Sequence, residues 1–358
     1  MQSKSQSAMV DVPEQQPSGA GPSPAGVAVW ASDAWRAAAL EWLDARLAGQ
    51  GIARIGDVTQ PHLRPWATAL RVPTTRGPVW LKAASSGTAF EVRLYGLLSR
   101  LVPDQVLEPL AIDEARSWIV LPDGGLTLGA VALGDALPGA LGAALAQYAG
   151  LQRALMPHAE ELVAIGAADM RAARMPERFA QALALCEDHV ARAGTAEDRV
   201  LLARVIAQRE RFAAWCRELE QSAVPSSLDH NDLHPWNIFA ARPGVPERAY
   251  DWGDSVVAHP FASLLVALGF VRHGLQVGPD DPRVAQVRDA YLVRFSDLGS
   301  RAELVRAVEL ACHVGKVARS LTWARAIALE GEPAGPHARA PLRWLAAVLD
   351  PAYVIAGG

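Results

Sequence analysis

The chain has 358 residues, of which 51% are hydrophobic and 20% charged, and its formal net charge is −4. This length and composition are typical of a folded protein with room for two lobes, and they exclude a fibre or a wholly disordered chain. Because binding to a nucleic-acid backbone relies on a broad basic surface, we expect no nucleic-acid partner.

The cysteines and the apolar runs indicate the compartment. The three cysteines lie far apart with no Cys-x-x-Cys pair, so the sequence predicts neither a disulfide framework nor a zinc site. The N-terminus has no basic segment followed by an apolar run, and the most apolar stretch, Phe261 to Val271, is too short to span a bilayer. We therefore expect a cytoplasmic protein with no membrane partner.

The first part of the chain predicts a tail followed by a helix. Residues 1–28 are rich in Ser, Gln, Gly and Pro and have few large apolar side chains, which predicts a disordered tail. Ser32 is placed to cap a helix from Asp33 to Leu47, whose apolar residues recur at helical spacing until Gly49.

Two strands come next, and the second contains Lys82. The runs from Trp66 to Val72 and from Val79 to Ala83 have strand character, and residues 73–77 between them suit a hairpin connection. A lone Lys at the end of a strand is more often simply solvated. Whether Lys82 has a functional role therefore depends on motifs further along the chain.

A helix from Ala89 to Leu101 contains Glu91, for which two roles stay open. Glu91 is the first Glu after Lys82, so its carboxylate is the candidate partner of the Lys82 amine. Residues 88–91 also read Thr-Ala-Phe-Glu, a capping-box pattern in which Glu91 would bond back to the backbone of Thr88.

The run from Trp118 to Leu121 predicts a buried strand, which Pro122 and residues 123–125 interrupt. An apolar strand that ends in a flexible corner suits a hinge, although a simple turn explains the same residues. The remaining pattern is mostly helical. The clearest helical segments are Leu141 to Leu155, Met175 to Ala193, Ala196 to Glu220, Asp281 to Phe295, Arg301 to Leu329 and Pro341 to Leu349.

Polar residues with the spacing of a phosphoryl-transfer loop stand between these helices. Within Leu228 to Phe239, His230 lies two residues before Asp232 and Asn237 lies five residues after it. Asp251 begins a later Asp-Trp-Gly motif. A carboxylate such as Asp232 can accept or orient the proton of an attacking hydroxyl. The Asn237 amide oxygen and the Asp251 carboxylate are hard ligands suited to Mg²⁺ on ATP phosphates.

Simpler structures account for parts of the His230 to Asn237 pattern. A turn with a helix cap explains either motif alone, because His, Asp and Asn are common loop residues. His230 and His234 imitate half of a zinc-binding helix, but Asn231 replaces the Glu that a zinc protease needs. Pro235 also argues against a continuing helix.

The two motifs together resemble those of the aminoglycoside phosphotransferase and choline kinase family, the small-molecule kinases of the protein-kinase-like fold. In that family the loop usually reads His-Gly-Asp-Leu-His-Pro-Gly-Asn, and the metal motif usually begins Asp-Trp or Asp-Phe. The resemblance implies an α+β, two-lobed protein-kinase-like fold with a small antiparallel-sheet lobe at 29–121. It implies a hinge at 122–126 and a larger, mostly helical lobe at 127–358 that contains the catalytic loop.

The resemblance also implies a role for each residue on the nucleotide side. It implies that Lys82 reaches the α- and β-phosphates of ATP and pairs with Glu91. It further implies that backbone groups of Leu121 and Asp123 meet the adenine edge.

On the catalytic side the resemblance implies that Asp232 is the base and that His230 supports the loop. It implies that Asn237 and Asp251 are the Mg²⁺ ligands, with ATP and Mg²⁺ as the cofactors.

Several positions depart from the family pattern. The Gly after the His is replaced by Asn231, which tolerates a left-handed backbone, and the Gly before the Asn is replaced by Trp236. Trp236 either lines the acceptor side or packs over the loop. Where the family has Gly-Asp-Pro and a further Asp, residues 258–260 read Ala-His-Pro and Ser263 follows. The missing acids weaken the inference of a polycationic antibiotic as acceptor.

The sequence therefore predicts an ATP-dependent phosphotransferase that moves the γ-phosphoryl group to a hydroxyl of a small molecule, either an antibiotic or a metabolite. Two alternatives stay open. One is a catalytically inactive nucleotide-binding protein, motivated by the changed Gly and acidic positions. The other is a helical scaffold with no nucleotide site, whose loop merely resembles the motif.

Overall fold

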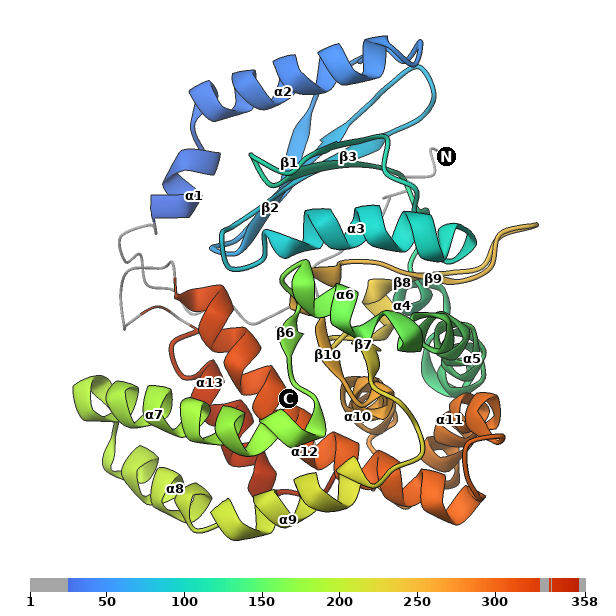
Figure 1. The fold of residues 1–358 in the computed structure, drawn as a ribbon. Helices are drawn as coiled ribbons and strands as arrows, with labels where there is room; N and C mark the ends of the chain where they lie inside the picture. The colour runs from blue at the N-terminus through green and yellow to red at the C-terminus, as the bar shows by residue number, and fades with distance from the viewer. Residues whose placement is uncertain (1–24, 329–334, 336, 354–358) are drawn as a thin grey trace.

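The computed structural model describes residues 25–328, 335 and 337–353. Figure 1 shows a small lobe built on a sheet above a larger, mostly helical lobe, which is the α+β architecture that the sequence predicts. Residues 1–24 of the predicted tail lie outside the described residues, and residues 25–28 are the first residues of helix α1.

The small lobe is an antiparallel sheet with the strand order β1-β2-β3-β5-β4. Helices α1 and α2 lie on one side of it and α3 on the other (Figure 1). Its elements are α1 (Ala25–Trp30), α2 (Asp33–Ala48), β1 (Thr59–Leu63), β2 (Ala67–Val72), β3 (Val79–Ala84), α3 (Phe90–Leu101), β4 (Ala111–Asp113) and β5 (Trp118–Pro122).

The α2 helix begins where the sequence predicts, because the Ser32 hydroxyl accepts a hydrogen bond from the Trp35 amide at 3.2 Å. Its buried face, which includes Leu43 and Leu47, packs with Leu81 of β3 in a separate hydrophobic core. The alternate residues of β3 point to the opposite face of the sheet, so Lys82 faces α3 and the large lobe. The sheet thereby fixes the direction in which Lys82 points.

The sequence analysis missed the two edge strands. Strand β1 contains Pro61, is largely exposed and has an irregular register between Thr59 and His62, so its apolar alternation is absent. Strand β4 has three residues, all of them only half-buried. Edge strands need less burial than central strands, and this leaves a weak pattern in the sequence.

The large lobe contains most of the helices. Its elements are α4 (Leu128–Val131), α5 (Leu137–Leu155), α6 (Ala159–Ala164), β6 (Ala168–Asp169), α7 (Met175–Ala193), α8 (Ala196–Ile206), α9 (Arg209–Glu220), β7 (Ser227–Asp229), β8 (Ile238–Phe239), β9 (Arg248–Ala249), β10 (Val256–Ala258), α10 (Leu264–Leu275), α11 (Pro282–Leu292), α12 (Arg301–Ile327) and α13 (Ala340–Ala346).

Two small sheets bring the polar motifs together. Strand β7 ends at Asp229, immediately before the loop, and pairs antiparallel with β10. Strands β8 and β9 form a hairpin that returns the chain to Tyr250 and Asp251. The fully buried Trp252 ring lies 4.9 Å from the ring of His230, so the second motif packs directly on the first.

One helix prediction was wrong. The segment from Ala196 to Glu220 is two helices, α8 and α9, separated by a turn at Ala207 and Gln208. The helix predicted from Arg301 is confirmed as far as Ile327, and Leu329 lies outside the described residues.

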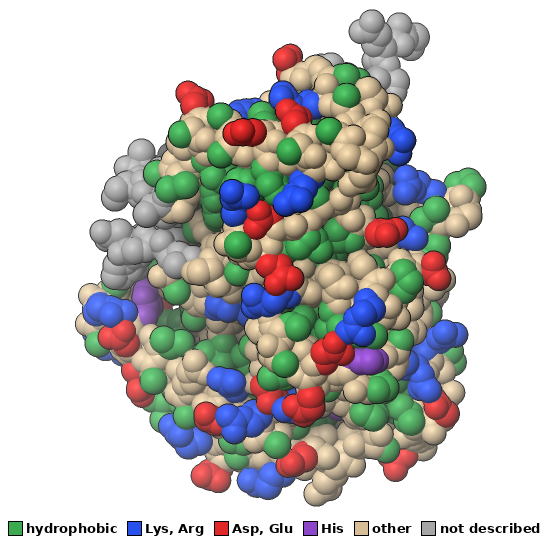
Figure 2. Space-filling view, turned by 45° about the horizontal axis from the view of Figure 1, so that its top comes forward, with side chains coloured by type: hydrophobic (Ala, Val, Ile, Leu, Met, Phe, Trp, Pro, Cys, Tyr) green, Lys and Arg blue, Asp and Glu red, His purple; other side chains and the backbone are tan. Residues whose placement is uncertain are grey.

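The surface agrees with the low net charge. On the face shown in Figure 2, basic and acidic side chains are interspersed among apolar ones. Within the described ranges, no helix is long and apolar enough to cross a membrane.

Lys316 of α12 is a fully buried charge in the large lobe. Its Nζ donates hydrogen bonds to the carbonyl oxygens of Ala347, Asp350 and Pro351 at 2.9, 3.0 and 2.7 Å. Burial lowers the pKa of Lys316 to about 8, so the amine still has three protons at neutral pH, one for each carbonyl. Lys316 thereby ties the C-terminal segment to α12.

We expect Lys316→Met to lower the free energy of unfolding by about 3 kcal/mol, because one buried and two partly buried carbonyls lose their donor while the packing volume is kept. Chemical denaturation measures this change. Arg217→Met, which removes an exposed cation from α9, is the control and should change stability by about 0.5 kcal/mol or less. Equal effects of the two substitutions would contradict this account of Lys316.

Candidate active site

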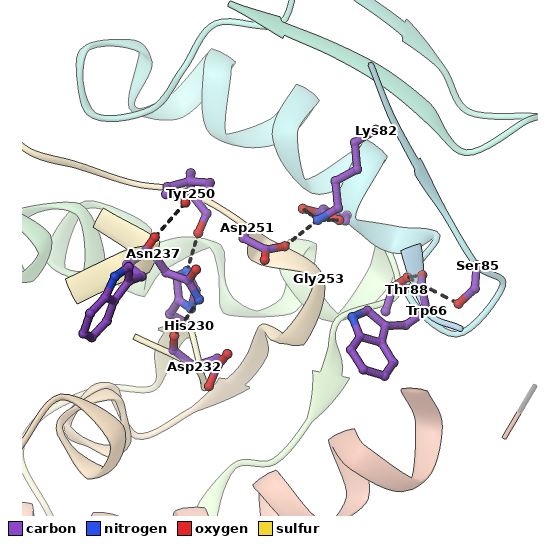
Figure 3. A network of polar contacts seen from close by, with 12 residues as sticks. Trp66, Lys82, Ser85, Thr88, His230, Asp232, Asn237, Tyr250, Asp251 and Gly253 are labelled. Atoms are coloured by element: carbon purple, nitrogen blue, oxygen red, sulfur yellow. Dashed lines mark hydrogen bonds and ion pairs between the residues drawn. The ribbon is translucent and has the colours of Figure 1, made fainter. Parts of the chain in front are cut away.

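A cavity of about 440 Å³ lies between the lobes and contains five of the predicted site residues. They are Lys82, Glu91, Asp232, Asn237 and Asp251. They come from β3, α3, the loop after β7 and the segment after β9, so residues far apart in sequence meet in one place (Figure 3).

Lys82 lies between two carboxylates from different lobes. Its Nζ is 2.7 Å from a carboxylate oxygen of Glu91 and 2.5 Å from Oδ1 of Asp251. Burial alone would lower the pKa of Lys82, but the charges of Asp251 and Glu91 raise it above its ordinary value. Lys82 is therefore a permanent positive charge that joins α3 to the second motif.

Glu91 forms the ion pair and not the capping box. The α3 helix has no side-chain cap, and the Thr88 hydroxyl donates instead to the carbonyl of Trp66 at 3.0 Å. A Cβ on Gly253 would lie 3.2 Å from the Glu91 carboxylate, so the backbone of the second motif passes very close to Glu91. The ion-pair alternative for Glu91 is confirmed, and the capping alternative was wrong.

Asp232 faces the cavity beside a buried arginine that the sequence analysis did not consider. Its Oδ1 is 3.0 Å from Nη2 of Arg319, and its Oδ2 is 3.6 Å from Nε2 of His234. Burial would raise the pKa of Asp232, but the charge of Arg319 outweighs it and holds the pKa well below its usual range. Asp232 is therefore ionised at neutral pH.

Arg319 also binds Asp254, with 2.7 Å between Nη1 and Oδ2, and its guanidinium covers the Trp344 ring at 5.1 Å. A signal for it existed in the sequence, because Lys316, Arg319 and Thr322 recur every three residues in an otherwise apolar part of α12. Charged residues are rarely buried without partners, so this polar stripe indicates an internal site.

His230 lies beneath the loop and not in the cavity. Its Nε2 is 2.8 Å from the carbonyl oxygen of Tyr250, and its backbone amide donates to the Tyr148 hydroxyl at 3.0 Å. Burial lowers the pKa of His230, so the ring is neutral at pH 7 and its proton is on Nε2. The ring thus links the first motif to the residue before Asp251.

Asn237 and Asp251 present the atoms that a magnesium ion would need. The Asn237 amide nitrogen donates to the carbonyl of Asp232 at 3.0 Å, which leaves the amide oxygen for a cation. The Asp251 side chain is 44% exposed. In the described part of the chain, no three His, Cys, Asp or Glu residues are grouped as a metal site. One amide and one carboxylate fit a metal that takes its other ligands from phosphates and water.

The backbone of both motifs is left-handed at one residue. Asn231 has φ 62° and Asp251 has φ 63°. The side-chain amide nitrogen of Asn231, Nδ2, donates to the Asp254 carbonyl at 3.2 Å and to the Thr322 hydroxyl at 2.9 Å. Asn therefore replaces the family's Gly without losing the conformation, and its side chain binds the second motif as well.

The buried carboxylate of Asp229 faces Ser263, the residue at the position where the family pattern has an acid. Its Oδ1 accepts hydrogen bonds from the backbone N–H of Asn231 at 2.8 Å and from the Ser263 hydroxyl at 2.5 Å. Where the family pattern has an Asp, this chain has Ser263 facing an Asp from the strand before the loop. Burial raises the pKa of Asp229 to about 6, although the hydrogen bonds from Ser263 and Asn231 act to lower it.

Three residues singled out in the sequence do not line the cavity. Leu121 is buried in β5 opposite Trp80, and the Asp123 carboxylate accepts the Gly125 amide at 2.8 Å. Their contact with adenine stays a prediction. Trp236 packs closely against Gly129 of α4, where a Cβ would lie 2.6 Å from its ring, so the packing alternative is the one found.

The family comparison agrees with the two-lobed fold. Residues 67–304 match the model of the phosphotransferase enzyme family, and the chain belongs to this family. Family and fold together indicate a phosphotransferase that acts on small molecules. No curated protein sequence matches the chain.

Solved structures share the fold at low sequence identity. Macrolide 2'-phosphotransferase MphH from Brachybacterium faecium is 18% identical, with a TM-score of 0.51 over 87% of this chain and 98% of that one. The choline kinase LicA from Streptococcus pneumoniae is 13% identical, with a TM-score of 0.53 over 87% and 98%. An ethanolamine kinase from Plasmodium vivax is 9% identical, with a TM-score of 0.58 over 82% of each chain.

We expect the raised pKa of Asp229 to make its ionisation costly. The carboxyl has a higher pKa when folded, so its contribution to stability is complete below about pH 4 and is lost as the pH rises through about 6. The shift corresponds to about 3 kcal/mol. Asp229→Asn should remove this loss. As the pH is raised from 4.5 to 7.5, the thermal midpoint of Asp229→Asn minus that of the native protein should therefore become more positive.

Asp297→Asn is the control, because the Asp297 carboxylate is exposed and pairs with Arg153, which lowers its pKa. Its effect on the midpoint should be constant across this pH range. Parallel curves for Asp229→Asn and the native protein would contradict the expected titration of Asp229.

Proposed function

We propose that this protein transfers the γ-phosphoryl group of Mg·ATP to a hydroxyl group of a small molecule. The observation that supports this most is the ion-paired set of Lys82, Glu91 and Asp251, which lines one cavity with Asp232 and Asn237. A phosphate-binding cation, two metal ligands and a proton acceptor then stand where one ATP and one acceptor could meet.

The charges of the site favour a bound divalent cation. Four carboxylates, those of Glu91, Asp232, Asp251 and Asp254, are paired with only Lys82 and Arg319. Around the Lys82 amine there are therefore two carboxylates for one positive charge, although Arg64, Arg339 and Arg343 line the same cavity. A magnesium ion held by Asn237 and Asp251 would lie beside this local excess of carboxylate and bind the phosphate oxygens.

The proposed transfer assigns one task to each residue. Lys82 holds the phosphates of ATP by charge, and Glu91 keeps its amine directed into the cavity. Asp232 orients the acceptor hydroxyl and takes its proton. The hydroxyl oxygen forms a bond to the γ-phosphorus while the bond to the bridging oxygen breaks, which yields ADP and a phosphate ester.

The inactive nucleotide-binding protein is a second candidate, and one contact favours it. Arg319 lies 3.0 Å from Asp232 and lowers its affinity for a proton. A protein of this kind would bind Mg·ATP through Lys82 and Asp251 and release no ADP with any acceptor. The scaffold alternative would bind neither, so calorimetric titration with Mg·ATP separates it from both.

We expect Asp232→Asn to keep nucleotide affinity and to lower phosphoryl transfer by about a hundredfold or more, the usual scale for a lost general base. The Asn amide keeps the size of Asp but cannot take a proton. ATP affinity and acceptor-dependent ADP release are measured on both proteins once a screen of hydroxylated metabolites and antibiotics has found an acceptor. Equal turnover would exclude Asp232 as the base.

We expect ATP to raise the thermal midpoint only when Mg²⁺ is present, because the carboxylates repel the triphosphate unless a cation lies between them. Asp251→Ala should abolish the Mg²⁺-dependent part of the shift. Asp254→Asn is the matched control and should keep it, since Asp254 binds Arg319 and not Lys82. A full shift in EDTA, or its loss only in Asp254→Asn, would contradict the metal assignment.

A further inference from the structure

The cavity has a second end, which we call the aromatic end, and Arg319 links it to Asp232, because its guanidinium lies 3.0 Å from that carboxylate and covers the Trp344 ring. The aromatic end is formed by Trp66 after β1, Trp323 of α12, His337, and Arg343 and Trp344 of α13. In Figure 3 Trp66 lies on the far side of Lys82 and Asp251 from His230 and Asn237. With ATP and Mg²⁺ on the catalytic residues, the aromatic end is the space left for the acceptor.

The carboxylates that line the cavity lie at its catalytic end. Glu91 and Asp251 are paired with Lys82, and Asp232 and Asp254 are paired with Arg319. Among the described lining residues there is no other acid. A cationic acceptor would therefore find no free counter-ion in this part of the structure.

The aromatic rings do not form an open cage for a cation either. The face of Trp344 is covered by the Arg319 guanidinium at 5.1 Å. Trp323 is stacked with His337 at 5.4 Å, and the Trp66 ring meets both of them edge-on at 5.7 and 5.3 Å. Recognition of an alkylammonium group needs free ring faces, and these rings largely cover one another.

Arg343 is one of four arginines that line the cavity, the others being Arg64, Arg319 and Arg339. It lies on α13 and is exposed. No described carboxylate lies within ion-pair distance of it, whereas the nearby Arg339 is paired with Asp198. A guanidinium binds carboxylate or phosphate oxygens in a two-pronged geometry that an ammonium cannot offer.

We infer that the acceptor is a small hydroxyl compound that also has an anionic carboxylate or phosphate group, and that Arg343 binds this group. The inference rests on the proposed phosphotransferase function. The anion pairs with Arg343, the rings of the aromatic end cover the apolar part of the molecule, and the hydroxyl reaches Asp232.

The test is a thermal-shift screen in the presence of Mg·ADP, followed by ADP release with ATP. The screen uses hydroxylated compounds in sets that share a scaffold and differ in charge. One set is glucose, glucosamine, glucuronate and glucose 6-phosphate, and another is glycerol, glycerate, glycerol 3-phosphate and 3-amino-1,2-propanediol. The carboxylate and phosphate members of each set show which anion is preferred. The screen extends to hydroxylated antibiotics and acids of other scaffolds.

We expect the hits to be acidic and to depend on Arg343. For the best acceptor, Arg343→Gln should raise KM about tenfold or more with little change in kcat, and KM should rise with ionic strength in the native protein. Arg217→Gln, an exposed cation outside the cavity, is the matched control and should change neither constant.

The outcomes separate this inference from the proposed function. ADP release with neutral or amine acceptors, or with an acid whose KM is unchanged in Arg343→Gln, overturns the inference and leaves the phosphotransferase standing. No hit and no ADP release with any class of acceptor overturns both.

Discussion

The ammonium group of Lys82 lies between two carboxylates, one from each lobe. Glu91 approaches from α3 and Asp251 from the segment after β9, and the distances of 2.7 and 2.5 Å allow direct ion pairs. A buried amine is stable only when its charge is matched, and removal of either carboxylate would leave a charge uncompensated. This contact joins the two lobes at the cavity and holds the Lys82 amine beside Asp251. It also places two carboxylates around one positive charge, which suits the metal ion of the proposed function.

The catalytic loop departs from its family pattern in sequence and keeps its contacts by other means. Asn231 takes the left-handed conformation of the usual Gly and adds two hydrogen bonds from its side chain. Ser263 stands where the pattern has an acid, and Asp229 supplies a carboxylate to the same place from the opposite side. The loop thus keeps a left-handed residue at position 231 and has a buried carboxylate beside position 263.

The sequence predicted the parts of the fold whose patterns are local. The α2 helix, the three internal strands of the small-lobe sheet and both polar motifs were predicted from local patterns of spacing, apolar residues and capping. Edge strand β1 was missed because Pro61 and exposure remove its alternation, and the break between α8 and α9 was missed because the charge pattern continues across it. Arg319 was missed for a different reason, since its partners are more than 60 residues away in sequence. The scarcity of lysine was a further signal in the sequence, because the chain has only three. The two that the structure describes, Lys82 and Lys316, are both buried and have several partners each.

Arg319 raises the question of how Asp232 can act as a base when its pKa is held so low. In phosphoryl transfer the transition state is loose, with little bond formation to the incoming oxygen, so the hydroxyl keeps its proton until late. A strong base is then less useful than a carboxylate fixed in direction, and the 3.0 Å contact with Arg319 fixes Asp232. The same guanidinium stacks on Trp344 at the aromatic end. In the proposed reaction, one side chain would therefore set both the orientation of Asp232 and the wall against which the acceptor lies, so the contact with Arg319 is compatible with turnover.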